Sequence, residues 1–250
     1  MPANQLVPER IAYSAAPERP PLRWPGGARV ALWVAPNIEH YEFLPEHIRV
    51  RDPWPRLPHP DILGYGLYNT RYHWNLSEAD ERAAIEECQH IHRQFTGRGL
   101  PGWFSPAASN TLNTPDLVAE AGIGYLCDLY HDDQPTPIQV RQGELYSLPY
   151  SMEINDSIAW RRGQEGAAFA QKICDEFDTL YAEGAVSGQV MNIAVHPFIM
   201  GQPHRIELLT QALDYVLSHS GVWCAAGSDI VASYREQTQP ATQAGQKEPS

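Results

Sequence analysis

A histidine and a glutamate follow apolar runs of this chain, at positions where catalytic groups commonly lie. His196 comes directly after the run 190–195 and precedes Pro197, and Glu39 follows the run 29–35 after a short gap. An imidazole can protonate a leaving amine near neutral pH, and a carboxylate can serve as a general base or a metal ligand. Both residues are therefore candidate catalytic groups, although for Glu39 a solvated loop carboxylate is an equally good interpretation.

Two further polar groups follow other apolar runs. Asp132 and Asp133 come after the run 123–129. Neighbouring carboxylates point in different directions, so one can orient a catalytic partner while the other caps a turn. The segment 149–156 carries many polar side chains, which can bind an amide or hydroxyl group of a substrate or can cap helices and turns. We count Asp132 and Asp133 among the candidate catalytic residues.

Residues so far apart in sequence meet only if the apolar runs are parallel strands of one α/β fold. The continuous apolar runs 29–35 and 189–195 are typical of buried parallel strands. Ser77 is the expected N-cap of a helix that ends at Gly97. Strands that alternate with helices predict βαβ units, and an α/β barrel has its active site at the carboxyl ends of its strands. The other expected elements are strands at 100–106, 123–129, 144–150 and 222–226, and helices at 114–122 (N-cap Thr114), 164–182, 203–218 and from Ser228 onward.

The composition bounds the domain organisation and the partners. With 250 residues and 43% hydrophobic residues, the chain can form a packed core. We expect an extended N-terminal arm (1–24), one α/β domain (25–236) and a disordered tail (237–250). A net charge of −12 does not favour nucleic acid or an anionic membrane as a partner. Since no apolar leader and no bilayer-spanning run is visible, we expect a cytoplasmic protein.

Short motifs in a fixed order resemble the polysaccharide deacetylase-like (NodB-homology) superfamily. Each motif alone is unspecific, but the ordered set covers most of residues 20–236. The branch that it is most similar to contains ureide-hydrolysing allantoinases and proteins called polysaccharide deacetylases. The motifs are the stretches 23–31, 37–39, 101–106, 113–117, 127–135, 148–156 and 196–205.

The resemblance implies a distorted (β/α) barrel that hydrolyses a non-peptide carbon–nitrogen bond. The implied partner is a small linear or cyclic amide or an N-acetylated sugar. Glu39 stands in the first catalytic motif of the family, Trp103 to Pro106 in the groove-forming motif, and His196 in the last motif. The residues that we assign to substrate binding are Asn37, Trp103, Ser105, Pro106, Tyr150, Glu153, Asn155 and Arg205.

The chain departs from the family at its metal motifs. In metal-using relatives an Asp/His/His site activates water, whereas here Asn37-x-Glu39 replaces the Asp-Asp pair. A strand–helix–strand portion of roughly 30 residues or more, ending in a His-Gly metal motif, is also missing between 60–66 and 67–72. The cofactor therefore stays open: the family implies a divalent metal such as zinc, but its histidine ligand is missing. We expect an incomplete barrel, which a second subunit could complete in a homo-oligomer.

A second class of function is compatible with the same sequence. A barrel that lacks the His-Gly portion could have lost catalysis and could bind a carbohydrate or a protein partner instead. Tryptophan rings can stack on sugars, and the candidates are Trp33, Trp54, Trp74, Trp103 and Trp160. Binding without release of acetate or ammonia would favour this alternative.

We expect Glu39→Gln and His196→Ala each to lower kcat by about 10²–10⁴-fold, the usual contribution of a general acid or base. Turnover of a panel of small amides measures the effect. Unchanged turnover in both variants would reject the assignment.

Overall fold

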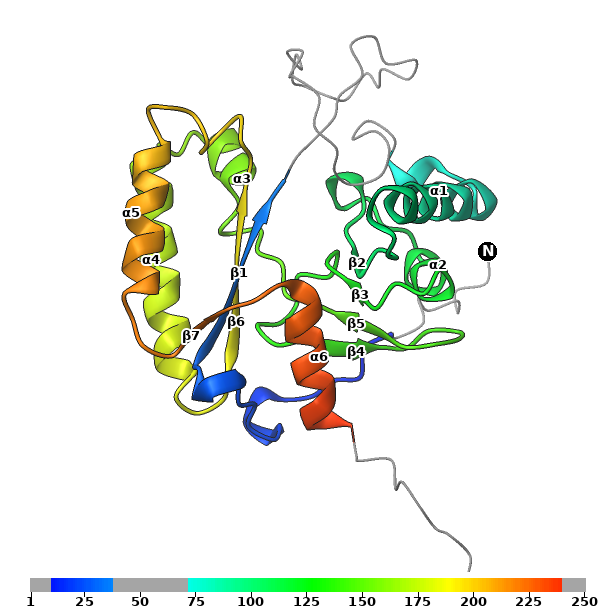
Figure 1. Cartoon of the computed structure of the whole chain (residues 1–250), viewed down its shortest axis with the longest axis horizontal. Coiled ribbons are helices and arrows are strands. Elements are labelled where there is room, and N and C mark those ends of the chain that lie inside the picture. Colours follow the sequence, from blue (N-terminus) through cyan, green and yellow to red (C-terminus); the bar gives the residue numbers. More distant parts are fainter. Residues whose placement is uncertain (1–9, 38–71, 240–250) are drawn as a thin grey trace, which may run out of the picture.

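A computed structural model of the chain describes residues 10–37 and 72–239, and its first sheet is parallel (Figure 1). The sheet order is β6-β1-β7, with β1 at Val30–Pro36, β6 at Gln189–Val195 and β7 at Val222–Cys224. Strands β1 and β6 pair along their whole length, so that Pro36 lies opposite Val195. The backbone N–H of Asn37 donates to the carbonyl oxygen of Val195 at 2.7 Å. This pairing brings Asn37 beside His196.

The second sheet is short and mixed. Its order is β2-β3-β5-β4, with β2 at Gly102–Trp103, β3 at Tyr125–Leu126, β5 at Leu145–Ser147 and β4 at Thr136–Ile138. β4 runs antiparallel to β5 and is a strand that the sequence did not predict. Its central residue is Pro137, which is exposed and which lacks a backbone donor, as suits the edge of a sheet.

Helices cover both sheets. α4 and α5 pack together beside the first sheet, and α1 and α2 lie beside the second sheet (Figure 1). The helices are α1 (Glu78–Thr96), α2 (Thr114–Glu120), α3 (Asp156–Arg161), α4 (Gly166–Glu183), α5 (Ile206–Leu217) and α6 (Gly227–Thr238), with short 3₁₀ turns at Ala16–Glu18, Pro25–Gly27, His73–Asn75 and Pro106–Ala108. The expected α/β class is confirmed. Among the described residues, the two sheets do not join into one closed ring.

The largest part of the core lies between α4 and β6. Phe169, Ile173 and Phe177 recur at four-residue steps along α4 and are almost fully buried. They belong to the same apolar cluster as Met191 and Ile193 of β6. Burying each such side chain contributes about 1.5–3 kcal/mol relative to exposure, so this contact fixes α4 against the strand that leads to His196. None of the helices in the described ranges is both long and apolar enough to cross a membrane.

The predicted helix starts are partly right. Ser77 caps α1, since its hydroxyl accepts from the N–H of Asp80 at 3.2 Å. Thr114 does not cap α2: Asn113 holds that position, and the Thr114 hydroxyl bonds to the buried carboxylate of Glu81. Ser228 does not cap α6 either, because that helix already begins at Gly227. α3 is a short helix that the sequence did not predict.

Residues 10–24, the described part of the N-terminal arm, are tied to the domain. Arg10 forms an ion pair with Asp116 at 2.6 Å, and Arg19 forms one with Asp132 at 2.6 Å. Leu22 and Trp24 are buried in the apolar cluster that includes residues of β1 and β6. At the other end of the chain, α6 continues to Thr238, into the segment expected to be a disordered tail.

The ring of Tyr125 is held between two glycines. A Cβ atom at Gly102 would lie 2.0 Å from Tyr125 ring carbons, and one at Gly227 would lie 2.8 Å from the Tyr125 hydroxyl oxygen. The ring therefore occupies the space that a side chain at either glycine would need. The two glycines allow β2 and the start of α6 to approach β3 closely.

We expect Gly102→Ala to lower the free energy of unfolding by about 1–3 kcal/mol, the usual cost of overpacking. Gly124→Ala is the matched control, since its Cβ would meet only the Pro101 carbonyl oxygen at 3.6 Å. Urea unfolding of both variants measures the difference. Equal stability of the two variants would show that the Tyr125 ring can relax.

Candidate active site

The carboxyl ends of β1 and β5 meet in a hydrogen bond between Asn37 and Tyr150. The amide nitrogen of Asn37 donates to the Tyr150 hydroxyl at 3.0 Å, and both residues are almost fully buried. The Tyr150 ring stacks on Phe104 with centroids 4.5 Å apart and meets Trp33 edge-on at 6.1 Å. The structure thus brings together two predicted site residues on an aromatic support.

The carboxyl end of β6 carries a buried histidine–carboxylate pair. His196 Nδ1 lies 2.5 Å from Asp156 Oδ1, and the backbone N–H groups of His196 and Met200 donate to Asp156 Oδ2 at 2.8 and 3.2 Å. A carboxylate only accepts, so the imidazole carries its hydrogen on Nδ1. In the neutral ring Nε2 then holds the lone pair, and in the cation Nε2 can donate a proton. The sequence analysis missed Asp156, although it lies in the polar segment 149–156.

The groove-forming stretch makes its own buried network. Ser105 donates to Asp128 through its backbone N–H at 2.9 Å and through its hydroxyl at 2.8 Å. Trp103 Nε1 donates to the Ser105 hydroxyl at 3.2 Å, and Pro106 is buried beside them. Burial raises the pKa of Asp128 to about 7 despite these bonds. The signal for Asp128 in the sequence was a carboxylate inside an otherwise apolar run.

A buried histidine supports the same stretch. The His73 ring stacks on Trp103 at 5.8 Å, and His73 Nδ1 lies 3.2 Å from Glu81 Oε1. Glu81 also accepts from the hydroxyl of Thr111 at 2.7 Å. Burial opposes the charge of Glu81, but the contacts with His73, Thr114 and Thr111 outweigh it and lower the pKa of this carboxyl. Nothing in the spacing of His73 indicated this contact.

Asp132 and Asp133 lie far from His196. Asp132 is bound by Arg19 in two hydrogen bonds of 2.6 and 2.9 Å, which fix the N-terminal arm. The carbonyl oxygen of Asp133 accepts from the N–H of Val190, near the amino end of β6. Six residues of a strand span roughly 20 Å, so Val190 and His196 stand at opposite ends of β6. The structure does not bring these two carboxylates to the histidine.

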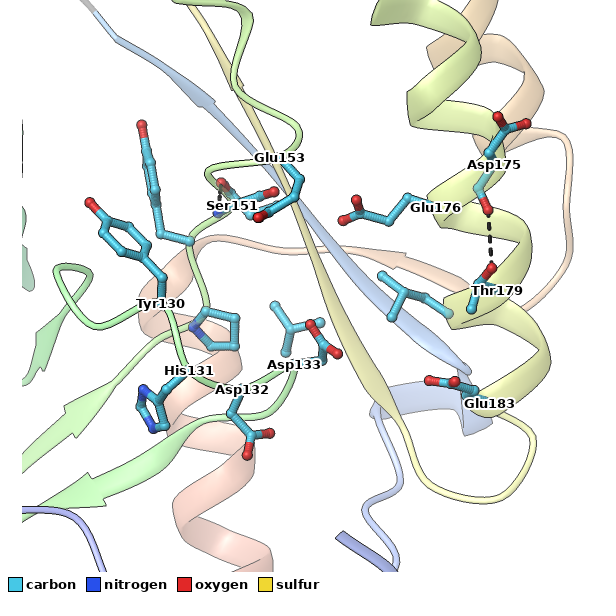
Figure 2. Close-up of a pocket in the computed structure, with 15 residues that line it drawn as sticks. Tyr130, His131, Asp132, Asp133, Ser151, Glu153, Asp175, Glu176, Thr179 and Glu183 are labelled. Carbon is cyan, nitrogen blue, oxygen red and sulfur yellow. Dashed lines mark hydrogen bonds between the residues drawn. The ribbon is translucent and has the colours of Figure 1, made fainter. Parts of the chain in front are cut away.

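A cavity of about 590 Å³ opens between α4 and the loops beside β6 (Figure 2). Its wall includes Asp133, Glu153, Glu176 and Glu183, and Figure 2 shows these carboxylates directed into it from three segments. Burial, together with the charges of Asp133 and Glu153, raises the pKa of Glu176 to about 7. Burial and neighbouring carboxylates also raise the pKa of Asp133. The cavity is therefore a place where carboxylates repel one another.

The last two predicted binding residues have structural contacts. The side chain of Asn155 caps α3, since its oxygen accepts from the N–H groups of Ser157 and Ile158 at 3.0 and 3.3 Å. Arg205 lies over the indole ring of Trp160, with its guanidinium carbon 4.1 Å from the centroid. Both residues lie close to the Asp156–His196 pair in sequence or in space.

The described residues do not fit a metal site. Among them, no three histidine, cysteine, aspartate or glutamate side chains are grouped so that they could hold a metal ion. Glu39, the candidate ligand from the sequence, lies outside the described residues, as does Trp54. Of the other tryptophans considered for sugar stacking, Trp74 and Trp160 are exposed, Trp33 is half-buried and Trp103 is buried.

Comparison with known proteins defines the fold. No protein-family model and no curated protein matches the chain. The crystal structure of Puue allantoinase matches with a TM-score of 0.75 at 23% identity, covering 88% of this chain and 95% of that chain. A probable polysaccharide deacetylase from Pseudomonas aeruginosa matches with a TM-score of 0.73 at 24% identity, covering 88% of this chain and 96% of that chain. The chain therefore shares the fold of these two structures, the NodB-like α/β fold that its motifs predicted.

The raised pKa of Glu176 makes stability depend on pH. The native state keeps a proton that the unfolded chain releases near pH 4.5, so this group lowers the free energy of unfolding as the pH rises from about 5 to 8. We expect Glu176→Gln to remove the part of this pH-dependent loss of stability that Glu176 causes. The free energy of unfolding of Glu176→Gln should exceed that of the unaltered protein by an amount that grows with pH. This difference should reach about 1 kcal/mol at pH 8, allowing for screening by solvent.

Urea unfolding at pH 5 and pH 8 measures the gain. Glu86→Gln, at an exposed position on α1, is the control and should show no such growth. A gain in Glu176→Gln that does not change with pH would contradict the account.

Proposed function

We propose that this protein hydrolyses a non-peptide carbon–nitrogen bond in a small amide or an N-acetylated compound. The observation that carries the proposal is the buried Asp156–His196 pair at the end of β6, next to Asn37 at the end of β1. Active sites of α/β barrels lie at this end of the strands. The fold shared with an allantoinase and a polysaccharide deacetylase supports the same class of reaction.

The reaction needs a proton at the departing nitrogen. Water adds to the carbonyl carbon, the carbon–nitrogen bond breaks, and a carboxylic acid and an amine leave. An amide anion is a poor leaving group, so the nitrogen must be protonated as the bond breaks. The imidazolium of His196 supplies this proton from Nε2, and Asp156 stabilises the cation through Nδ1. We assign the proton of the attacking water to Glu39 on the sequence motif alone.

Asn37 and Tyr150 are proposed to bind the carbonyl group of the substrate. One amide hydrogen of Asn37 goes to the Tyr150 hydroxyl, which leaves the second hydrogen to donate elsewhere. Donors that are fixed before the reaction stabilise the oxyanion that forms when water adds. The stacked ring of Phe104 and the edge of Trp33 hold Tyr150 in place for this task.

We expect Asp156→Asn to lower kcat by about 10²–10⁴-fold, because the imidazole loses the group that orients it and stabilises its charge. The alkaline limb of the kcat–pH profile should also move to lower pH, since the cation is no longer stabilised. Release of acetate or ammonia from small amides measures both effects.

Asp214→Asn, at an exposed position on α5, is the control and should keep full activity. Thermal unfolding shows whether Asp156→Asn remains folded. An unchanged pH profile would contradict the role of Asp156, and sugar binding with no product from any amide would favour the non-catalytic alternative.

A further inference from the structure

Helix α3 holds two side chains of the segment that follows β6. Its first residue, Asp156, binds His196, and Trp160 lies under the guanidinium of Arg205 at 4.1 Å. Asp156 and Trp160 are four residues apart, so they share one face of the helix. A single short helix therefore fixes the imidazole and the guanidinium relative to each other. Figure 1 shows α3 at the end of the molecule where β1 and β6 terminate.

The charge of Arg205 is not neutralised by the described part of the protein. Its Nη1 makes one long hydrogen bond, to the carbonyl oxygen of Ile199 at 3.4 Å, and the guanidinium forms no ion pair with a described carboxylate. A guanidinium has five donors in a planar fork that matches a carboxylate in two parallel bonds. In a chain of net charge −12, a half-buried arginine that has no acidic partner among the described residues is available to an anion.

Two neighbours hold the side chain of Arg205 in place. The Trp160 ring supports the guanidinium from one side. The stem packs against the start of α4, where a Cβ atom at Gly166 would lie 3.2 Å from Arg205 Cγ. The amino end of α4 adds a partial positive charge at the same place. Asp156, Trp160, Gly166 and Arg205 all line one small recess.

We propose that Arg205, supported by Trp160, binds a carboxylate group of the substrate and so selects small amides that carry an acidic group. The inference rests on the proposed function and names its substrate class. Side chains four residues apart on a helix are separated by roughly 6 Å at Cβ. A carboxylate bound at Arg205 would thus lie near the imidazole, which suits a compound whose carboxylate and scissile amide are a few bonds apart.

Binding of a matched pair of ligands tests the proposal without requiring turnover. N-acetylglycine carries the carboxylate, and N-acetylglycine N-methylamide is its neutral counterpart. We expect an NMR titration to give at least a tenfold lower Kd for N-acetylglycine. Arg205→Ala should abolish this preference without changing the Kd of the neutral compound, and Trp160→Leu should reduce it. Arg162→Ala removes an exposed arginine that directly follows α3, and it should leave the preference for N-acetylglycine intact.

The outcomes separate this proposal from the proposed function. Equal Kd values for the two compounds, no binding of either, or a preference that survives in Arg205→Ala would overturn the carboxylate site. The same spectra report acetate and glycine if N-acetylglycine is hydrolysed. A third outcome is that the preference for N-acetylglycine is lost in Arg205→Ala, yet no compound of a wider amide panel is hydrolysed. This result would support the carboxylate site and contradict the proposed hydrolase activity.

Discussion

The buried carboxylate of Asp156 organises the candidate active site. Moving a carboxylate out of water is costly unless its oxygens are hydrogen-bonded. Here they accept from the imidazole and backbone of His196 and from the backbone of Met200, and the charge lies at the favourable amino end of α3. The same contacts attach α3, the end of β6 and the following turn to one another. A helix of only six residues thereby obtains a fixed position that its own hydrogen bonds would not give it.

Among the described residues, the edge of β6 that faces away from β1 lacks regular strand pairing, and this explains where the acidic cavity lies. One edge of β6 pairs fully with β1, whereas the other edge receives single contacts: Asp133 accepts from Val190, and Ile154 accepts from Ala194. Between these contacts no strand of the described ranges fills the space, and side chains from three segments face one another across it (Figure 2). Carboxylates can gather there because the opening keeps them in partial contact with water.

The sequence predicted best the elements that bury continuous apolar runs. The predicted bounds of β6 agree with the structure, and those of β1 differ by one residue, because β6 and the first three residues of β1 are buried apolar runs. β4 escaped notice because its proline suggests a turn, and β2 and β3 have only two residues each in regular pairing. Strand-end reasoning found His196, and the family resemblance found Asn37.

The same reasoning could not assign partners to the carboxylates. Asp132 was expected to take part in the chemistry, but it is bound by an arginine 113 residues away in sequence, a contact that no local spacing reveals. Asp156 resembled an ordinary polar residue at a turn, and only its three donors distinguish it. His73 had no suggestive spacing because its partner Glu81 is buried on α1, eight residues later.

The N-terminal arm has a consequence for the order in which the protein folds. Arg10 and Arg19 bind carboxylates that lie 106 and 113 residues later in the chain, and the Leu22 backbone bonds to the Ser187 hydroxyl, 165 residues later. During synthesis the arm therefore emerges well before the groups that receive it. Contacts of such long sequence separation form slowly, so we expect the arm to dock late in folding.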